Sequence, residues 1–473
     1  MAEIRPLIAA LALAGLLAGC ATTPTAPPQL ELPQGTLASA PVELERWWTS
    51  FQDPALTGLI DEALANNVDV LAAQQRLAQS RAELGLANSA FLPEVGLALS
   101  GSRGSASGDV QQPRQAQPTP TGNQYRGGLT LSYEIDLSGR LRAARTAADA
   151  RLAASRYARE GTAASVAGQV AKAYFTLLHL DADQALATQA LSARQEALGL
   201  RHKLLSAGMA RREDIQLAEA QLASTRASLV QTEALRERAE ASLAVLLGRS
   251  PRQIMAAAPP REPVLAKLAQ APEIPAGLHA ELLQRRPDVR AAEAQLVAAS
   301  AGVDEARARY FPSLSLSGFF GGESLSLSNL LESSTRTWNI GAAIAQPLVG
   351  LYRVGRQVEQ AQAVREQVLL TYQQTARQAY ADTRAALAAH RAAREQLVAA
   401  ESTAKAVAAV SELTNLRLRQ GAASRLDLLD VENDRLSVER NRATALRDRV
   451  NALVDVYQAL GGGWSETVAA KAQ

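Results

Sequence analysis

Few residues in this chain of 473 have the types and spacing that chemistry requires. The histidines are all more than four residues apart, so no two can bind a metal from adjacent turns of one helix. They are His179, His202, His279 and His390. The single cysteine, Cys20, allows neither a disulfide nor a multi-cysteine metal site, and no serine lies in a Gly-x-Ser-x-Gly pattern. We therefore expect no metal, no cofactor and no enzymatic activity.

Charged side chains gather after two glycines, Gly208 and Gly421. The charged residues that follow are Arg211, Arg212, Glu213 and Asp214 in the first case, and Arg425, Asp427 and Asp430 in the second. Both groups precede an expected helix. The simplest interpretation is that the aspartates are ordinary negative charges near the positive end of a helix dipole.

The cysteine has a clearer context. Arg5 precedes an apolar run, Leu7–Leu17, that is too short to span a bilayer, and Cys20 follows almost at once. This arrangement resembles the signal peptide and lipobox of bacterial lipoproteins, which implies acylation of Cys20 on its thiol and on the new amino terminus. Ala21, which is not aspartate, implies sorting to the outer membrane. The alternative is an ordinary secretory signal with an accidental cysteine.

The composition limits the possible partners. Basic and acidic residues nearly cancel, at 49 against 47, so no overall field favours nucleic acid. Aromatic residues are scarce, with 6 Phe, 9 Tyr and 4 Trp, while alanine is abundant. This composition favours long, closely packed helices, and we expect a chain without a central core.

An internal repeat organises the chain. Residues 67–70 and 91–93 recur in related form 219 positions later, whereas Gly208 and Asp214 recur 213 positions later, at Gly421 and Asp427. We assign the six-residue difference to a longer loop before Gly128. The expected segments are a signal peptide (1–19), an acylated N-terminus with a Pro-rich tether (20–54), a first repeat (55–250), a connector (251–280), a second repeat (281–464) and a tail (465–473).

Each repeat is expected to begin with a helix that ends at a proline, over Val68–Ala90 and Asp288–Arg309. A β-hairpin follows, because apolar and polar residues then alternate. The expected strands cover residues 95–100, 129–137, 314–316 and 338–344. Long loops, Gly101–Gly127 and Gly318–Thr337, are expected between them.

Two unusually long helices come next, over Leu141–Leu204 and about Val354–Leu416, and neither contains proline. At 1.5 Å per residue each is roughly 95 Å long. A shorter helix is expected to return from each glycine break, ending near Leu247 or Leu460, with leucines at seven-residue spacing. We therefore expect each repeat to form an antiparallel helical hairpin with coiled-coil packing.

The hairpin strands carry one apolar and one polar face. Such a sheet can face hydrocarbon only if its edges are paired in a closed barrel, and four strands are too few to close one. We therefore expect an oligomer. The alternative is that the strands pack on each other as a small soluble sandwich.

Five motifs together support a resemblance. They are Trp47-Trp48-x-x-Phe51-x-Asp53-Pro54-x-Leu56, Asn67-x-Asp69, Arg286-Pro287-Asp288-Val289, Tyr310-Phe311-Pro312-x-Leu314 and Leu460-Gly461-Gly462-Gly463-Trp464. With the lipobox, they resemble the outer membrane factor family, in its lipoprotein branch of NodT and OprM type, related to TolC. The likeness runs from Cys20 to Trp464, nearly the whole mature chain.

The resemblance implies an internally duplicated α+β membrane channel. It implies a homotrimer with a twelve-stranded transmembrane β-barrel, four strands per chain, continued by a twelve-helix periplasmic α-barrel. Such channels lie in the outer membrane of Gram-negative bacteria and export small molecules as the exit duct of a tripartite efflux pump. Their partners are outer-membrane lipid, a periplasmic adaptor (membrane fusion protein) and an inner-membrane RND-type transporter. The alternative is a periplasmic coiled-coil adaptor or scaffold lipoprotein without a pore.

The resemblance also implies a gate at the periplasmic mouth. It places Asp427 and Asp430 around that mouth, where three copies would form a negative constriction that binds cations and repels anions. Arg425 is a candidate for closing the gate by pairing with Asp214 or Glu213. This sequence has Leu418 and Ala423 where some relatives carry polar or aromatic gate residues, so the bonding of the closed state stays open.

Overall fold

The computed structural model describes residues 45–104, 122–256, 261 and 285–464. Cys20, the signal peptide, the Pro-rich segment up to residue 44, most of the connector and the tail lie outside the described residues. The chain divides into two compact units. Among the described residues, the sheet unit comprises those within 78–154 and 292–372. The hairpin unit comprises those within 45–77, 155–291 and 373–464.

The helices repeat in length as well as in order. Helices α3 (Val68–Ser89) and α9 (Pro287–Ala308) have 22 residues each, and α6 (Arg212–Leu246) and α11 (Arg425–Ala459) have 35 each. The strands of the two hairpins are separated by different numbers of residues, 105–121 between β1 and β2 against 325–335 between β3 and β4. This six-residue difference lies where the sequence predicted it, and the internal duplication is confirmed.

The two long helices are α5 (Arg140–Ser206) and α10 (Leu351–Arg419), with 67 and 69 residues. Each ends at a glycine in the left-handed region, Gly208 or Gly421, both with φ of 72°. The residue after each glycine donates its backbone N–H to the last turn of the helix, over 2.8 Å in both cases. Among the described residues, no helix has an apolar stretch long enough to cross a bilayer.

Two residues from the sequence motifs, Asn67 and Arg286, donate hydrogen bonds to the C-terminal ends of α6 and α11. The Asn67 side-chain amide donates to the Leu246 carbonyl oxygen over 2.8 Å, and the Arg286 guanidinium donates to the Ala459 carbonyl oxygen over 3.0 Å. The two acceptors are equivalent positions in the repeat. Asn67 and Arg286 therefore have the same structural role in the two copies. Each donates a hydrogen bond to a carbonyl oxygen that has no intrahelical partner because it lies at a helix end.

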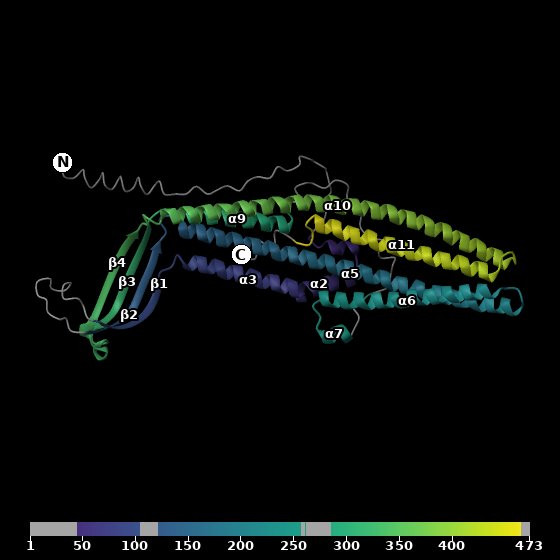
Figure 1. The fold of residues 1–473 in the computed structure, drawn as a ribbon, viewed down its shortest axis with the longest axis horizontal. Coiled ribbons are helices and arrows are strands. Elements are labelled where there is room, and N and C mark those ends of the chain that lie inside the picture. The colour runs from purple at the N-terminus through teal and green to yellow at the C-terminus, as the bar shows by residue number, and fades with distance from the viewer. Residues whose placement is uncertain (1–44, 105–121, 257–260, 262–284, 465–473) are drawn as a thin grey trace, which may run out of the picture. The chain divides into compact units, whose positions relative to one another are not determined.

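The sheet unit contains one antiparallel sheet in the order β1-β2-β3-β4, drawn side by side in Figure 1. Its strands are β1 (Glu94–Gly104), β2 (Gly122–Ile135), β3 (Ser313–Ser324) and β4 (Arg336–Ala345). The expected loops 101–127 and 318–337 were too long, because residues 101–104, 122–127 and 318–324 are paired strand. Glycine and serine blur the alternation there, but ladder hydrogen bonds still hold them extended.

The register separates the side chains into two faces. One row across the sheet joins Leu97, Leu129, Phe320 and Trp338. The next row on the same side joins Val95, Leu131, Gly318 and Ile340. We call this side the apolar face. The opposite side carries Ser132, Ser317 and Gly341 in one row and is mostly polar, although it also bears Phe319. Its charged residues are Arg126, Glu134 and Glu323.

The hairpin unit contains a well-defined hydrophobic core, which corrects the expectation of a chain without one. The short helix η1 (Trp47–Phe51) is part of it, and the Trp47 ring stacks on Tyr457 at 5.3 Å. Asp53 caps the next helix, α2 (Pro54–Asn66), and accepts a hydrogen bond of 2.8 Å from the Tyr174 hydroxyl. Residues 45–54, which the sequence analysis placed with the tether, thus include core residues.

The connector is described only at its start and at Arg261. It begins with α7 (Pro251–Ala256). The Arg261 guanidinium forms ion pairs with Asp181 on α5 and Glu240 on α6, all within the hairpin unit. A connector residue therefore crosslinks the two helices of the first hairpin.

Candidate functional site at the helical hairpin tips

The two aspartates nearest the tips are helix caps. The Asp427 carboxylate accepts from the Ser424 backbone N–H over 2.8 Å, and the Ser424 hydroxyl accepts from the Asp427 N–H over 3.1 Å. Hydrogen bonds from Ser424 lower the pKa of Asp427, which lies fully exposed. At the equivalent place, Asp214 accepts from the Arg211 N–H over 3.0 Å. Both carboxylates thus stabilise the start of a returning helix.

Arg425 connects the two hairpins. Its guanidinium binds Glu196 on α5 through two hydrogen bonds, of 2.8 and 3.0 Å, in a bidentate pair. The hydrogen bond from Arg425 is the main cause of a lowered pKa at Glu196. Within this chain the partner of Arg425 is therefore Glu196, rather than Asp214 or Glu213, which the sequence analysis considered. The reason is that the start of α11 lies beside α5.

Asp430 makes a second connection between α11 and α5. Its carboxylate lies 3.8 Å from the guanidinium of Arg194 and 3.8 Å from that of Arg201. Sequence reasoning missed these two arginines and Glu196. One signal was present, because Arg194 and Arg201 are seven residues apart and so share a face of α5. We call the pairs of Arg425 and Asp430 with α5 the tip clamp.

A third connection lies further from the tips and is more buried. Arg440 on α11 binds Asp183 on α5 through two hydrogen bonds, one of 2.8 Å, and Thr232 on α6 donates to the same carboxylate over 2.9 Å. Burial pushes the pKa of Asp183 upward, but the hydrogen bonds and charge of Arg440 and the Thr232 bond more than offset it, so the pKa is lowered. Three helices meet at this carboxylate.

Of the four histidines, His279 lies outside the described residues. Among the described residues no group of three or more His, Cys, Asp or Glu side chains is placed to hold a metal ion. His179 and His390 are buried in the hairpin unit. Burial, followed by the positive charge of Arg447, lowers the pKa of His179, as expected for an imidazole packed in a helix interface.

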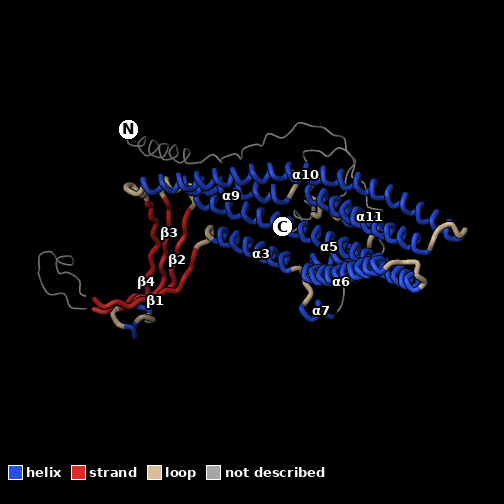
Figure 2. The backbone as a smooth tube through the Cα atoms, turned by 45° about the vertical axis from the view of Figure 1, so that its right-hand side comes forward, coloured by secondary structure: helices blue, strands red, loops and turns tan. Residues whose placement is uncertain are grey.

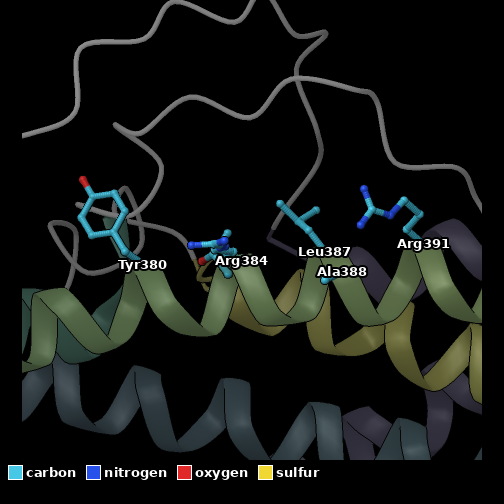
Figure 3. Close-up of a pocket in the computed structure, with 6 residues that line it drawn as sticks. Tyr380, Arg384, Leu387, Ala388 and Arg391 are labelled. Carbon is cyan, nitrogen blue, oxygen red and sulfur yellow. The ribbon is translucent and has the colours of Figure 1, made fainter.

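A cavity of about 510 Å³ lies against α10 in the hairpin unit. Figure 3 shows Tyr380, Arg384, Leu387 and Arg391 projecting from one side of this helix. Ala388 and Thr383 complete the described lining. The described part of the cavity wall is one helix with two arginines and no carboxylate, so it offers no set of converging groups that would define a catalytic or metal site.

A family model described as outer membrane efflux protein matches residues 59–249 and 278–462, one range in each repeat. The chain is 31% identical to the probable efflux pump outer membrane protein TtgC of Pseudomonas putida, over 98% of this chain and 96% of that protein. It is also 31% identical to the pyoverdine export outer membrane protein OpmQ of Pseudomonas putida, over 89% of this chain and 88% of that protein.

Solved structures show the same fold. The outer membrane channel CmeC of Campylobacter jejuni superposes with a TM-score of 0.81 at 26% identity, covering 94% of this chain and 97% of that one. The open state of the MtrE outer membrane channel of Neisseria gonorrhoeae gives 0.79 at 29% identity, covering 94% and 99%. The α+β channel fold predicted from the sequence is confirmed.

Proposed function

Because the chain belongs to the outer membrane efflux protein family, we propose that it is the outer-membrane exit duct of a tripartite efflux pump in a Gram-negative bacterium. The observation that carries this proposal is the family match over both repeats, together with a four-stranded sheet that has one apolar face. A pore-less adaptor or scaffold, the alternative from the sequence, is set aside because the matched family is one of outer-membrane channels.

We further propose a homotrimer. Strands β1 and β4 are the edges of the sheet, so each has one side without a partner strand among the described residues. Three copies joined edge to edge would make a closed barrel of twelve strands, which leaves no exposed edge in the membrane. The six helical hairpins would form twelve helices of periplasmic wall. Outer-membrane lipid would then cover the apolar face.

The proposed cargo is small molecules. Relatives are named for efflux of toluene, for efflux of antibiotics and for export of pyoverdine. The face of this sheet opposite the apolar face is mostly polar, and a duct lined by polar side chains discriminates little among such compounds. We infer that a periplasmic adaptor and an inner-membrane RND-type transporter supply the cargo and its selection. We assign no catalytic role to the chain.

We propose that the gate lies at the hairpin tips and divides its work between residues. Asp427 and Asp214 cap α11 and α6 and place a negative charge near each tip. Arg425 and Asp430 hold α11 against α5 through the tip clamp. Three copies around one axis would give a negative mouth that favours cations, closed while the clamps hold.

The function is tested with the purified full-length chain in planar lipid bilayers. We expect stepwise conductance, and an oligomer that resists SDS and changes its migration when heated. Because the proposed mouth is negative, the current should prefer cations. A protein that stays monomeric in detergent and produces no conductance would contradict the proposed function.

Cys20 is expected to carry the lipid anchor. Replacing it by serine (Cys20→Ser) should remove all acyl mass from the mature chain, as measured by mass spectrometry, while oligomers still form because the proposed barrel holds the membrane by itself. Ala21→Ser is the matched control and should retain the acyl mass. An unmodified N-terminus in the parent protein would refute the lipobox interpretation.

A further inference from the structure

The loop between β3 and β4 places one residue, Leu330, against the apolar face of the sheet. It comprises residues 325–335, contains the short helices η3 (Leu327–Asn329) and η4 (Ser333–Thr335), and is visible at the end of the strands in Figure 2. A β carbon on Gly127 would come within 3.2 Å of the Leu330 side chain, and one on Gly322 within 2.2 Å of the Leu330 carbonyl oxygen. The two glycines thus leave the room that Leu330 occupies beside Leu99 on this face.

The loop satisfies many of its backbone groups by itself. The N–H of Glu332 donates to Asn329 over 3.0 Å, and the N–H of Leu330 donates to Leu327 over 3.4 Å. The Thr335 hydroxyl lies 2.9–3.2 Å from the carbonyl oxygens of Asn329, Leu330 and Glu332. A loop that pairs its polar groups internally loses less when it leaves water than an open loop would.

The same loop exposes three leucines between polar residues, which include Ser326, Ser328, Asn329 and Glu332. Leu325, Leu327 and Leu331 are 77%, 59% and 93% exposed, within seven residues of chain. Exposed leucines this close together mark a contact surface rather than an ordinary solvated loop. Since Leu330 joins the loop to the apolar face, the three leucines extend that face beyond the strands.

We propose that this leucine loop (residues 325–335) is a membrane-interface anchor whose leucines enter the acyl-chain boundary of the outer leaflet. The inference rests on the proposed function, in which lipid covers the apolar face. The position of Trp338 agrees with it. This exposed ring points to the apolar face two residues inside Arg336, about 7 Å along the strand, where interfacial aromatic residues are common.

Three single-cysteine labels test the proposal. Leu331→Cys probes the loop, Ile340→Cys probes the apolar face of the strands, and Ser317→Cys probes the polar face. Each full-length variant is labelled with an environment-sensitive fluorophore and reconstituted into phosphatidylcholine vesicles. Quenching is measured with nitroxide carried on the upper acyl chain and, separately, with aqueous iodide. The parent protein, whose Cys20 is proposed to be acylated, gives the labelling background.

We expect the Leu331 label to behave like the Ile340 label, with strong quenching by acyl nitroxide and severalfold weaker quenching by iodide than at Ser317. If Ile340 is quenched by nitroxide but Leu331 responds mainly to iodide, the loop is solvated and the anchor is wrong while the proposed function stands. If neither quencher reaches Leu331, a neighbouring copy covers it, which also overturns the anchor. If Ile340 itself is not quenched by nitroxide, the proposed membrane barrel and the anchor fail together.

Discussion

Replacing Arg425 and Asp430 together by alanine is expected to raise the open probability of the channel by about one hundredfold. Each clamp contact joins side chains that are a fifth to a half exposed, so its contribution is small. Counting the two contacts of Asp430, each at 3.8 Å, as one, every chain has two clamp interactions of about 0.5 kcal/mol. Three chains then give about 3 kcal/mol, which is about one hundredfold in an equilibrium constant. Single-channel recording measures the change directly.

Closure by the tip clamp should depend on opposite charges at Arg425 and Glu196. Reversing one partner (Arg425→Glu) places two carboxylates together and should open the channel, while the double variant Arg425→Glu with Glu196→Arg should restore closure. Asp427→Asn is the matched control, because this carboxylate caps its own helix. It should weaken cation preference and leave closure nearly unchanged. An Asp427 variant that opens as far as the clamp variant would show that the caps, not the clamp, hold the gate.

The elements that positioned this site were predictable because each has a local cause. The prolines after α3 and α9 end those helices, and Gly208 and Gly421 provide left-handed turns that most other residues adopt only with strain. Because the chain is duplicated, each element assigned in one repeat could be checked against the equivalent element in the other. Strand ends were less predictable, since glycine-rich strand and glycine-rich loop differ only in whether a neighbouring strand pairs with them.

The contacts between distant segments were not predictable. Glu196 and Arg425 are 229 residues apart. Likewise, α5 carries many arginines besides Arg194 and Arg201 that could pair with a carboxylate on α11. Which of them meets α11 depends on the packing of helices, and a single sequence does not encode that in any local pattern. The core was missed for the same reason. Scarce aromatics suggested its absence, yet Trp47, Tyr174 and Tyr457 come together from three parts of the chain.

Removing the guanidinium of Arg440 should have the largest effect on stability. In Arg440→Met the Asp183 carboxylate, only 11% exposed, loses its charged partner. Breaking a buried pair costs about 3–5 kcal/mol, and we expect about 3 because Arg440 itself is one-third exposed. The measurement is the urea midpoint of helix loss, followed by circular dichroism in detergent at neutral pH. The matched control is Arg442→Met, which loses only the ion pair with Glu439 on its own helix and should cost about 0.5 kcal/mol.

The pH dependence separates this explanation from a simple loss of packing. In the parent protein the pKa of Asp183 is lowered from 3.8, so its contribution to stability is present above that value and is lost as pH falls through the folded-state pKa. Without Arg440, burial becomes the main influence and raises the pKa of Asp183, so protonation in the folded state relieves the unpaired charge. The stability difference between parent and Arg440→Met should therefore shrink as pH falls toward 4, while the Arg442→Met difference stays nearly constant. A difference for Arg440→Met that does not change with pH would mean that the side chain stabilises the three helices by packing and not by pairing with Asp183.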